Sequence, residues 1–328
     1  MSVLQSSVVL ILEKPVQARF LAPLVATYWP RQRVLAVYTL YLGLYEFRYP
    51  RGLTFSDLPY TGNPAWKERT FNYAHPALVV ELSSGEVCKT ALEPAQVIAS
   101  ATTIWYGCDP DASGANAYQV LLTQCLGAEA AAVERPAMFL TGLDKTSIQK
   151  ALDASTTTED PLFQTWLKKG EAKRFFDFNY NVNALALFGA SLRNVGVDTA
   201  NYGLSKYSLQ LLYFLNSCSQ HHEWRLFNLM DRWPGTGRYG PSSLGSVASR
   251  AFIVEGLISA RLVERAEGLV CISNRGREFL GQLHPDCQDQ DLPARLAEWQ
   301  IEWPASRKKI ERYLRTFFGK QLRFKSSL

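Results

Sequence analysis

The stretches Leu10-Ile11-Leu12-Glu13-Lys14-Pro15 and Trp105-Tyr106-Gly107-Cys108-Asp109-Pro110-Asp111 decide how this chain is expected to fold. Each contains or follows a short apolar run rich in β-branched residues, which is the pattern of a buried strand. Each strand would deliver carboxylates at its C-terminal end. Because the carboxyl ends of parallel strands meet at one edge of an open α/β sheet, we expect Glu13, Asp109 and Asp111 to converge there.

Three carboxylates at one sheet edge suit a hard cation with oxygen ligands. Magnesium takes one or two carboxylates together with phosphate oxygens and keeps several of its waters. The sequence therefore predicts a Mg²⁺ site at Glu13, Asp109 and Asp111.

The order of these motifs resembles the Toprim domain of type IA DNA topoisomerases, most closely the topoisomerase III branch. The resemblance covers roughly the first half of the chain. Its parts follow one another in family order: Glu13-Lys14-Pro15, Gln17-Ala18-Arg19, Phe55-Ser56-Asp57-Leu58-Pro59, Asp109-Pro110-Asp111 with Gly114 opening a helix, and Arg135-Pro136-Ala137-Met138-Phe139 leading into Leu143-Asp144-Lys145. The resemblance implies an α/β fold, a parallel sheet flanked by helices, and magnesium-dependent chemistry on DNA.

The acidic motif is shorter than in the family. Family members usually have Asp-x-Asp-x-Glu-Gly-Glu, and the two glutamates are replaced here by Ser113 and Ala115. A metal-assisted hydrolase would need only the three remaining carboxylates and an activated water. In such an enzyme Glu13 would act as general acid or base, and Lys14 would neutralise the scissile phosphate.

The family's gate is also missing. In the family a long arch with the nucleophilic tyrosine precedes a winged-helix-like domain, whereas this chain offers only residues 197–206 for it. We therefore expect no complete strand passage. Gly203-Leu204-Ser205-Lys206-Tyr207 resembles the start of the tyrosine motif, but the expected arginine and threonine are Leu209 and Gln210. Tyr207 is a candidate nucleophile, with a role in the core as the alternative.

The second half of the chain has the layout of a winged helix, whose third helix can enter the major groove of DNA. The expected elements are helices over residues 208–217, 223–232 and 242–255, a hairpin formed by 257–266 and 269–272, and a closing helix through Leu280. The stretch Gly235-Thr236-Gly237-Arg238 resembles the glycine-rich turn of the topoisomerase helical domain. Arg238 in this turn and Arg250 on the third helix are candidate phosphate contacts, while a winged helix used only for packing is the alternative.

The C-terminal segment is strongly basic. Residues 305–328 contain eight basic residues and the single acid Glu311, a net charge of +7 against +5 for the whole chain. Apolar residues at helical spacing would dock this helix and leave a basic outer face. We expect Arg307, Lys308 and Lys309 to contact DNA phosphates, with a solvated helix face as the alternative.

The 328 residues are enough for two domains. The polar run from Asp153 to Asp160 is the expected linker. It would separate a Toprim domain over 1–153 from a helical, winged-helix domain over 161–284, which a basic C-terminal helix over 290–328 would follow.

The six cysteines are scattered without a CxxC pair, which favours reduced thiols over a zinc site or disulfides. No run of eighteen or more apolar residues predicts a membrane span, and no signal peptide is indicated, so a cytoplasmic location is expected.

Two functions remain open at this stage. The first is a DNA-binding Toprim protein, similar to a truncated type IA topoisomerase, that nicks or cleaves DNA with Mg²⁺. The second is a non-catalytic DNA-binding relative that serves as an accessory in a larger DNA-processing complex.

Overall fold

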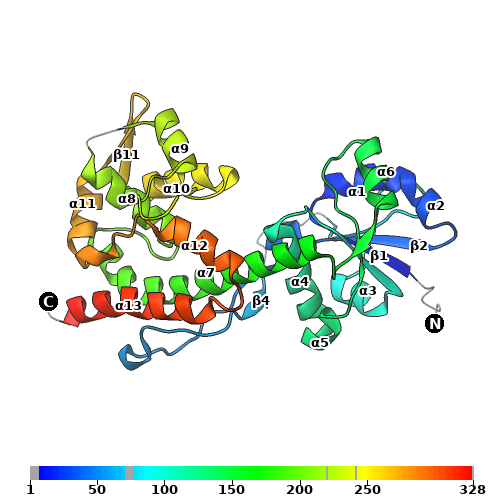
Figure 1. Cartoon of the computed structure of the whole chain (residues 1–328), viewed down its shortest axis with the longest axis horizontal. Coiled ribbons are helices and arrows are strands. Elements are labelled where there is room, and N and C mark those ends of the chain that lie inside the picture. Colours follow the sequence, from blue (N-terminus) through cyan, green and yellow to red (C-terminus); the bar gives the residue numbers. More distant parts are fainter. Residues whose placement is uncertain (1–6, 71–76, 219–220, 241, 327–328) are drawn as a thin grey trace. The chain divides into compact units, whose positions relative to one another are not determined.

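The computed structural model describes residues 7–70, 77–218, 221–240 and 242–326 (Figure 1). The chain forms two compact units. The first contains Met1–Arg48 and Ala65–Glu171, and the second contains Tyr49–Pro64 and Ala172–Leu328. Among the described residues, no helix is both long and apolar enough to cross a membrane.

The first unit is an α/β unit, as predicted, built around one central sheet. In the described part of the chain its strands lie in the order β6-β5-β2-β1-β7-β8-β9, and β2, β1, β7 and β8 are parallel to one another. The strands are β1 (Ser7–Leu12), β2 (Arg33–Tyr38), β5 (Val79–Glu81), β6 (Cys88–Lys89), β7 (Thr103–Gly107), β8 (Pro136–Ala137) and β9 (Thr156–Thr157). A separate antiparallel pair is formed by β3 (Tyr45–Phe47) and β4 (Trp66–Glu68).

Helices cover both faces of this sheet (Figure 1). The helices of the unit are α1 (Pro15–Leu21), α2 (Val25–Tyr28), α3 (Pro94–Ser100), α4 (Ala112–Leu126), α5 (Ala128–Ala131), α6 (Lys145–Asp153) and the first turns of α7 (Pro161–Asn194), with short 3₁₀ turns η1 (Ala22–Leu24) and η2 (Leu40–Leu42). Alternate side chains of β1 enter the two cores because side chains in a strand alternate between faces. Leu10 packs with α1, α2 and α6, and Ile11 packs with α3 and α4.

The expected linker is part of the sheet instead. Thr156 and Thr157 form β9, which pairs antiparallel with β8 at Ala137↔Thr156. Threonine is β-branched and favours extended backbone, so a polar run of threonines can close a sheet edge as readily as it can form a linker.

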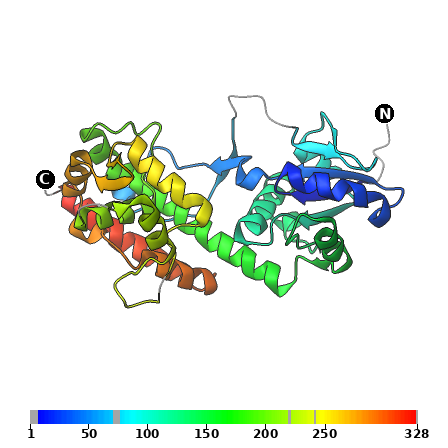
Figure 2. The ribbon, with the colours of Figure 1, turned by 90° about the horizontal axis from the view of Figure 1, so that it is seen from above.

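The second unit is mainly helical. It contains α7 from Ala172 onward, η3 (Phe55–Asp57), α8 (Lys206–Ser217), α9 (Glu223–Asp231), α10 (Val247–Ser259), α11 (Asn274–Gly281), η4 (Pro285–Cys287), α12 (Leu292–Ile301) and α13 (Arg307–Ser326). Its described strands β10 (His221–His222), β11 (Val263–Ala266) and β12 (Leu269–Ile272) form a sheet in the order β10-β12-β11. Helix α13 lies alongside α7 in both views (Figures 1 and 2), and Tyr180 of α7 contacts Phe318 of α13 at 5.3 Å between ring centroids.

The helix expected over 242–255 begins later and ends later, at Val247 and Ser259. Ser242 is held instead by a bridge to Trp233, whose N–H donates to the Ser242 carbonyl at 2.7 Å. Gly245 follows with a φ of +87°, which is incompatible with helix. These two features delay the start of α10.

Two buried asparagines of α7 hold the segment 49–64 in the second unit. Asn179 accepts from the Gly62 N–H at 2.7 Å and donates to the Gly62 carbonyl at 2.9 Å. Asn183, one turn later, makes the same pair of bonds to Tyr60, both at 2.8 Å. The two asparagine side chains therefore form hydrogen bonds to the backbone of this segment of the kind that a neighbouring strand would form.

Replacing Asn179 by alanine should destabilise the protein by about 2 kcal/mol, because it leaves two half-buried backbone groups of Gly62 without their partner. Urea unfolding should show this loss, and trypsin should cleave after the exposed Arg51 faster than in wild type. Asn194→Ala on the same helix is the control, because Asn194 is exposed and makes a 3.3 Å bond to Gln282. Equal stability of the two variants would contradict the anchoring role of Asn179.

Candidate functional site

The C-terminal edge of the parallel strands carries a cluster of polar side chains. Strands β1 and β7 are neighbours in register Leu12↔Gly107, so the residues that follow them emerge side by side. The Asp109 N–H donates to Glu13 Oε2 at 3.2 Å, and the Lys14 ammonium forms an ion pair with the Asp109 carboxylate. We call Glu13, Lys14, Gln17, Asp109 and Asp111 the Glu13 cluster.

Gln17 connects the two strand ends. Its side chain is completely buried, and its Oε1 accepts from the backbone N–H groups of Glu13 at 2.7 Å and Lys14 at 2.9 Å. Its Nε2 donates to Asp109 Oδ1 at 3.0 Å and more weakly to the Gly107 carbonyl at 3.4 Å. One amide therefore fixes the end of β1 to the aspartate that follows β7. The sequence offered a signal for this role, since Gln17 lies one helical turn after Glu13, but the sequence analysis did not assign it to the site.

Glu13 is poised to exchange a proton near neutral pH. Its side chain is only 1% exposed, and this burial, reinforced by the negative charge of Asp109, raises its pKa to about 7. The hydrogen bond from the Asp109 N–H and the charge of Lys14 act in the opposite direction, and Asp111 adds a smaller upward effect. A carboxyl group in this range can serve as acid or base.

Lys14 remains charged although it is partly buried. Burial by itself would lower its pKa, but hydrogen bonds to Asp109 and Tyr41 outweigh burial and hold the pKa above its ordinary value. The Lys14 Nζ also lies 4.8 Å from the centroid of the Tyr41 ring. The cluster thus places a permanent cation beside Glu13.

Asp111 begins helix α4. Its Oδ1 accepts from the backbone N–H groups of Ser113 and Gly114, both at 2.8 Å, which is a helix N-cap. A side chain at Gly114 would place its Cβ 2.2 Å from the Asp109 carbonyl oxygen. Glycine is therefore required for α4 to begin this close to Asp109.

The carboxylates fit magnesium only in part. No group of three or more His, Cys, Asp or Glu side chains that could hold a metal lies within the described ranges. Both Asp109 oxygens are engaged, by Lys14 and by Gln17, whereas Asp111 Oδ2 accepts no hydrogen bond from a described residue. This donor set suits an ion that takes one or two carboxylates and completes its shell with water and phosphate.

Tyr207 lies in the second unit, at the start of α8. Its partly buried ring packs against the core, and Lys206 Nζ lies 4.5 Å from its centroid. Burial raises the pKa of Tyr207 in spite of this cation, because Lys206 is itself buried and paired with Asp177. These surroundings favour the core role over the nucleophilic one.

The two arginines expected near the third helix differ in their availability. Arg238 is exposed, with its guanidinium 5.7 Å from the centroid of the Tyr239 ring. Arg250 is 9% exposed and donates to Asp231 at 2.6 Å and to Ser243 at 2.8 Å. Arg250 therefore supports the fold of α9 and α10 and does not present its charge to a ligand.

The three basic residues at the start of α13 have different partners. Arg307 pairs with Glu311 at 3.0 Å and donates to Asn63 at 2.8 Å, so it also anchors the segment 49–64. Lys309 is exposed but pairs with Glu302 at 2.7 Å. Lys308 is exposed, and within the described residues it forms no ion pair.

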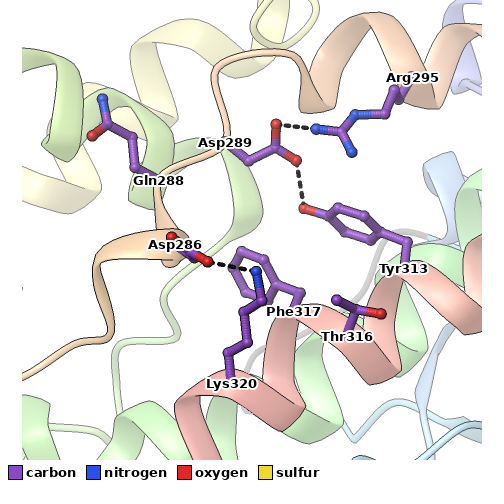
Figure 3. Close-up of a pocket in the computed structure, with 8 residues that line it drawn as sticks. All are labelled: Asp286, Gln288, Asp289, Arg295, Tyr313, Thr316, Phe317 and Lys320. Atoms are coloured by element: carbon purple, nitrogen blue, oxygen red, sulfur yellow. Dashed lines mark hydrogen bonds and ion pairs between the residues drawn. The ribbon is translucent and has the colours of Figure 1, made fainter. Parts of the chain in front are cut away.

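A pocket of about 290 Å³ lies in the second unit between η4, α12 and α13 (Figure 3). Its charges neutralise one another: Asp289 pairs with Arg295 and accepts from the Tyr313 hydroxyl at 2.8 Å, and Asp286 pairs with Lys320. The sequence analysis did not find this pocket. These pairs leave no net charge to select an ionic ligand.

Comparison with models of protein families and with curated proteins finds no match to this chain.

The protein should lose stability as the pH rises from about 4.5 to about 7. Glu13 has its ordinary pKa of 4.5 in the unfolded chain and a pKa of about 7 in the folded protein, so the folded state binds more protons between these values. Glu13→Gln removes this effect, and at pH 8 the variant should be more stable than wild type by up to about 3 kcal/mol, since one pKa unit corresponds to about 1.4 kcal/mol.

Urea unfolding at pH 5, 6, 7 and 8 without divalent metal would measure this effect. Glu81→Gln is the control of opposite sign, because the ion pair with Arg33 lowers the pKa of Glu81 and the pair is lost in the variant. A Glu13→Gln variant that is less stable than wild type at pH 8 would refute the raised pKa.

Proposed function

We propose that this chain is a DNA-binding protein with a Toprim-like first unit, and that it breaks a DNA phosphodiester bond at the Glu13 cluster in a Mg²⁺-dependent reaction without complete strand passage. The observation that carries the proposal is the pairing of a buried carboxyl group of pKa about 7, Glu13, with a permanent cation, Lys14, at the carboxyl edge of a parallel sheet. Perturbed acids in such positions are typical of catalytic sites.

Each residue of the cluster has a role in this proposal. Lys14 would bind the scissile phosphate, which would release Asp109 from its present ion pair. Asp109 and Asp111 would hold Mg²⁺, and Glu13 would move the proton. When bound, Mg²⁺ supplies positive charge that stabilises the phosphate as negative charge builds up. Gln17 would keep Asp109 and the end of β1 in register.

A winged helix in the second unit is part of the proposal. Its support is the succession α8, β10, α9, α10, β11, β12 and α11, with a sheet in the order β10-β12-β11. The buried Arg250 weakens a direct role for α10 in phosphate binding, so we place the main DNA contacts on α13 and on Arg238. A cytoplasmic location also belongs to the proposal, and the six free cysteines support it.

The exposed basic residues of α13 define the proposed DNA surface. They are Lys308, Lys309, Arg312, Arg315 and Arg323. The opposite face of α13 is anchored by Ile310, Leu314 and Phe318, which are completely buried. This helix is therefore docked, with its cations outward, as phosphate binding requires.

A non-catalytic accessory role in a larger DNA-processing complex is the second candidate. The ion pair between Lys14 and Asp109 favours it, because both groups satisfy each other without a ligand. This candidate predicts DNA binding without any change to the DNA.

With Mg²⁺, the wild-type protein should convert supercoiled plasmid into nicked circles without a ladder of closed topoisomers. Glu13→Gln should reduce the rate at least about 100-fold, since a positioned acid or base contributes about 10²- to 10⁴-fold. Lys14→Ala should also reduce it at least about 100-fold, since removing one positioned electrostatic contact costs about 10²- to 10³-fold. Electrophoresis with ethidium separates nicked from closed circles. Tyr207→Phe is the control and should nick at the wild-type rate.

The outcomes separate the two candidates. Intact plasmid with both Mg²⁺ and Mn²⁺ would favour the accessory role. A ladder of closed topoisomers would show that the protein relaxes the plasmid in steps and closes the broken strand again. This result would overturn the proposal of simple nicking. Equal rates in wild type and Glu13→Gln would exclude the Glu13 cluster as the site.

Affinity for a duplex oligonucleotide should fall with salt at a slope of log K against log salt of about −4 to −5, because about five phosphates are neutralised. Lys308→Ala with Arg312→Ala should make the slope shallower by about 2. Fluorescence anisotropy would measure both. Lys89→Ala with Lys150→Ala, two exposed lysines of the first unit, is the matched control. A slope that the α13 variant leaves unchanged would rule out this surface.

A further inference from the structure

The turn that follows strand β2 holds two residues in an unusual backbone conformation. Leu40 and Tyr41 have φ values of 47° and 57°, in the left-handed region that side chains with a Cβ avoid. Two hydrogen bonds fix this turn to the end of β1. The Thr39 N–H donates to the Leu12 carbonyl at 2.8 Å. The Leu40 N–H donates to the Glu13 carbonyl at 3.1 Å, so the turn is attached to the Glu13 cluster.

Packing explains the conformation of Leu40 but not that of Tyr41. The partly buried Leu40 side chain packs against both cores of the first unit. Tyr41 is 58% exposed, so burial of its ring contributes little to the stability of the turn. Residues that are held in sparsely populated backbone conformations gather at functional sites.

The contact that Tyr41 makes is with Lys14. The Lys14 Nζ lies 4.8 Å from the centroid of the Tyr41 ring, and the Tyr41 side chain is also a hydrogen-bond partner of this ammonium. The Asp109 carboxylate forms the ion pair with the same ammonium. Two groups of different chemistry therefore hold one flexible lysine side chain.

The two partners of Lys14 differ in what they leave for a ligand. A carboxylate neutralises the ammonium, whereas an aromatic ring attracts it through the ring quadrupole and leaves its charge in place. In the proposed function Asp109 holds Mg²⁺, so Lys14 loses its ion pair at the moment when it must bind the phosphate. The Tyr41 ring carries no charge and can keep its contact during this exchange.

We propose that Tyr41 is a positioning residue that holds the Lys14 ammonium at the Glu13 cluster while Asp109 exchanges Lys14 for the metal. This role rests on the proposed function and adds a residue to its site. Tyr41 acts through Lys14 and needs no contact with the DNA. The unfavourable φ of Tyr41 is then explained, because this backbone conformation brings the ring to Lys14.

The rate at which acetic anhydride labels Lys14 tests the contact without metal or DNA. The reagent needs the uncharged amine, which the ion pair and the ring both disfavour. In full-length Asp109→Asn protein the ion pair is lost and the ring remains, so adding Tyr41→Leu should speed the labelling of Lys14 about 2- to 5-fold. With Asp109 present, the same change should have a smaller effect.

Mass spectrometry would measure this labelling. Trypsin does not cut before Pro15, so Lys14 is the one lysine of the peptide that spans residues 1–19, and the exposed Lys89 is the internal reference. Tyr41→Phe keeps the ring and should retain most of the protection. Phe55→Leu, at an exposed aromatic residue of the second unit, is the matched control and should leave the labelling of Lys14 unchanged.

Tyr41→Gly separates a positioning role from a role in folding. Glycine adopts a positive φ without strain, so the melting temperature of this variant should be at least that of wild type. In the Asp109→Asn protein, Lys14 should nevertheless be labelled as fast with Tyr41→Gly as with Tyr41→Leu. If Tyr41 served only the fold, Tyr41→Gly would lower the melting temperature and leave the labelling of Lys14 unchanged.

The plasmid nicking assay connects the contact to the reaction. Tyr41→Leu should lower kcat about 2- to 5-fold and change KM for the plasmid less than about twofold, because the proposed DNA surface on α13 supplies most of the affinity. Tyr41→Phe should restore kcat to the wild-type value.

Three outcomes would overturn this role, and they can be told apart. Equal labelling of Lys14 in Asp109→Asn with and without Tyr41→Leu would show that the ring does not hold the ammonium, whether or not the plasmid is nicked. Faster labelling with an unchanged kcat would show that the contact does not serve the reaction, and the proposed function would stand. An intact plasmid with the wild-type protein would overturn the proposed function together with the role of Tyr41.

Discussion

The burial of strand β1 on both faces is the constraint on which the rest of the first unit depends. β1 lies between β2 and β7 and supplies alternate side chains to two separate cores. Such a strand can carry polar side chains only where it ends. Glu13 is the first charged residue after it and is still 1% exposed. The raised pKa of Glu13 is therefore a consequence of how the sheet is built.

The Glu13 cluster compensates for this burial with fixed hydrogen bonds. Gln17 satisfies the backbone at the end of β1 and orients Asp109, while Lys14 balances the Asp109 charge. The ionised form of Glu13 is compensated only in part, by the Asp109 N–H and the charge of Lys14, so the folded protein loses stability as the pH rises from about 4.5 to about 7. Proteins retain such local costs mainly where a site uses them, which is why the cluster and not the nearly neutral pocket by α13 supports the proposed chemistry.

In the second unit, the main requirement is to order residues 49–64, whose regular structure in the described chain is the short turn η3. Residues 49–64 have few backbone partners of their own, and the amides of Asn179 and Asn183 supply them from α7. Arg307 and Arg315 of α13 add side-chain contacts to Asn63 and Thr61. Two of the basic residues of α13 thus contribute to the fold. The charge that α13 can present to DNA is therefore smaller than its net charge.

The sequence by itself determined the local elements and their order. Apolar β-branched runs marked β1 and β7, and strand ends marked the site of Glu13 and Asp109. The break at Glu267-Gly268 marked the hairpin of β11 and β12, although its first strand begins at Val263 and not at Leu257, which belongs to α10. Only the tertiary structure decided which partner each polar side chain found. It buried Arg250 against Asp231, placed Thr156 at a sheet edge, and turned Tyr41 toward Lys14. The periodicity of a sequence shows which face of an element is apolar. These contacts depend instead on how distant elements pack, and on backbone angles that the residue type does not favour, such as the positive φ of Tyr41.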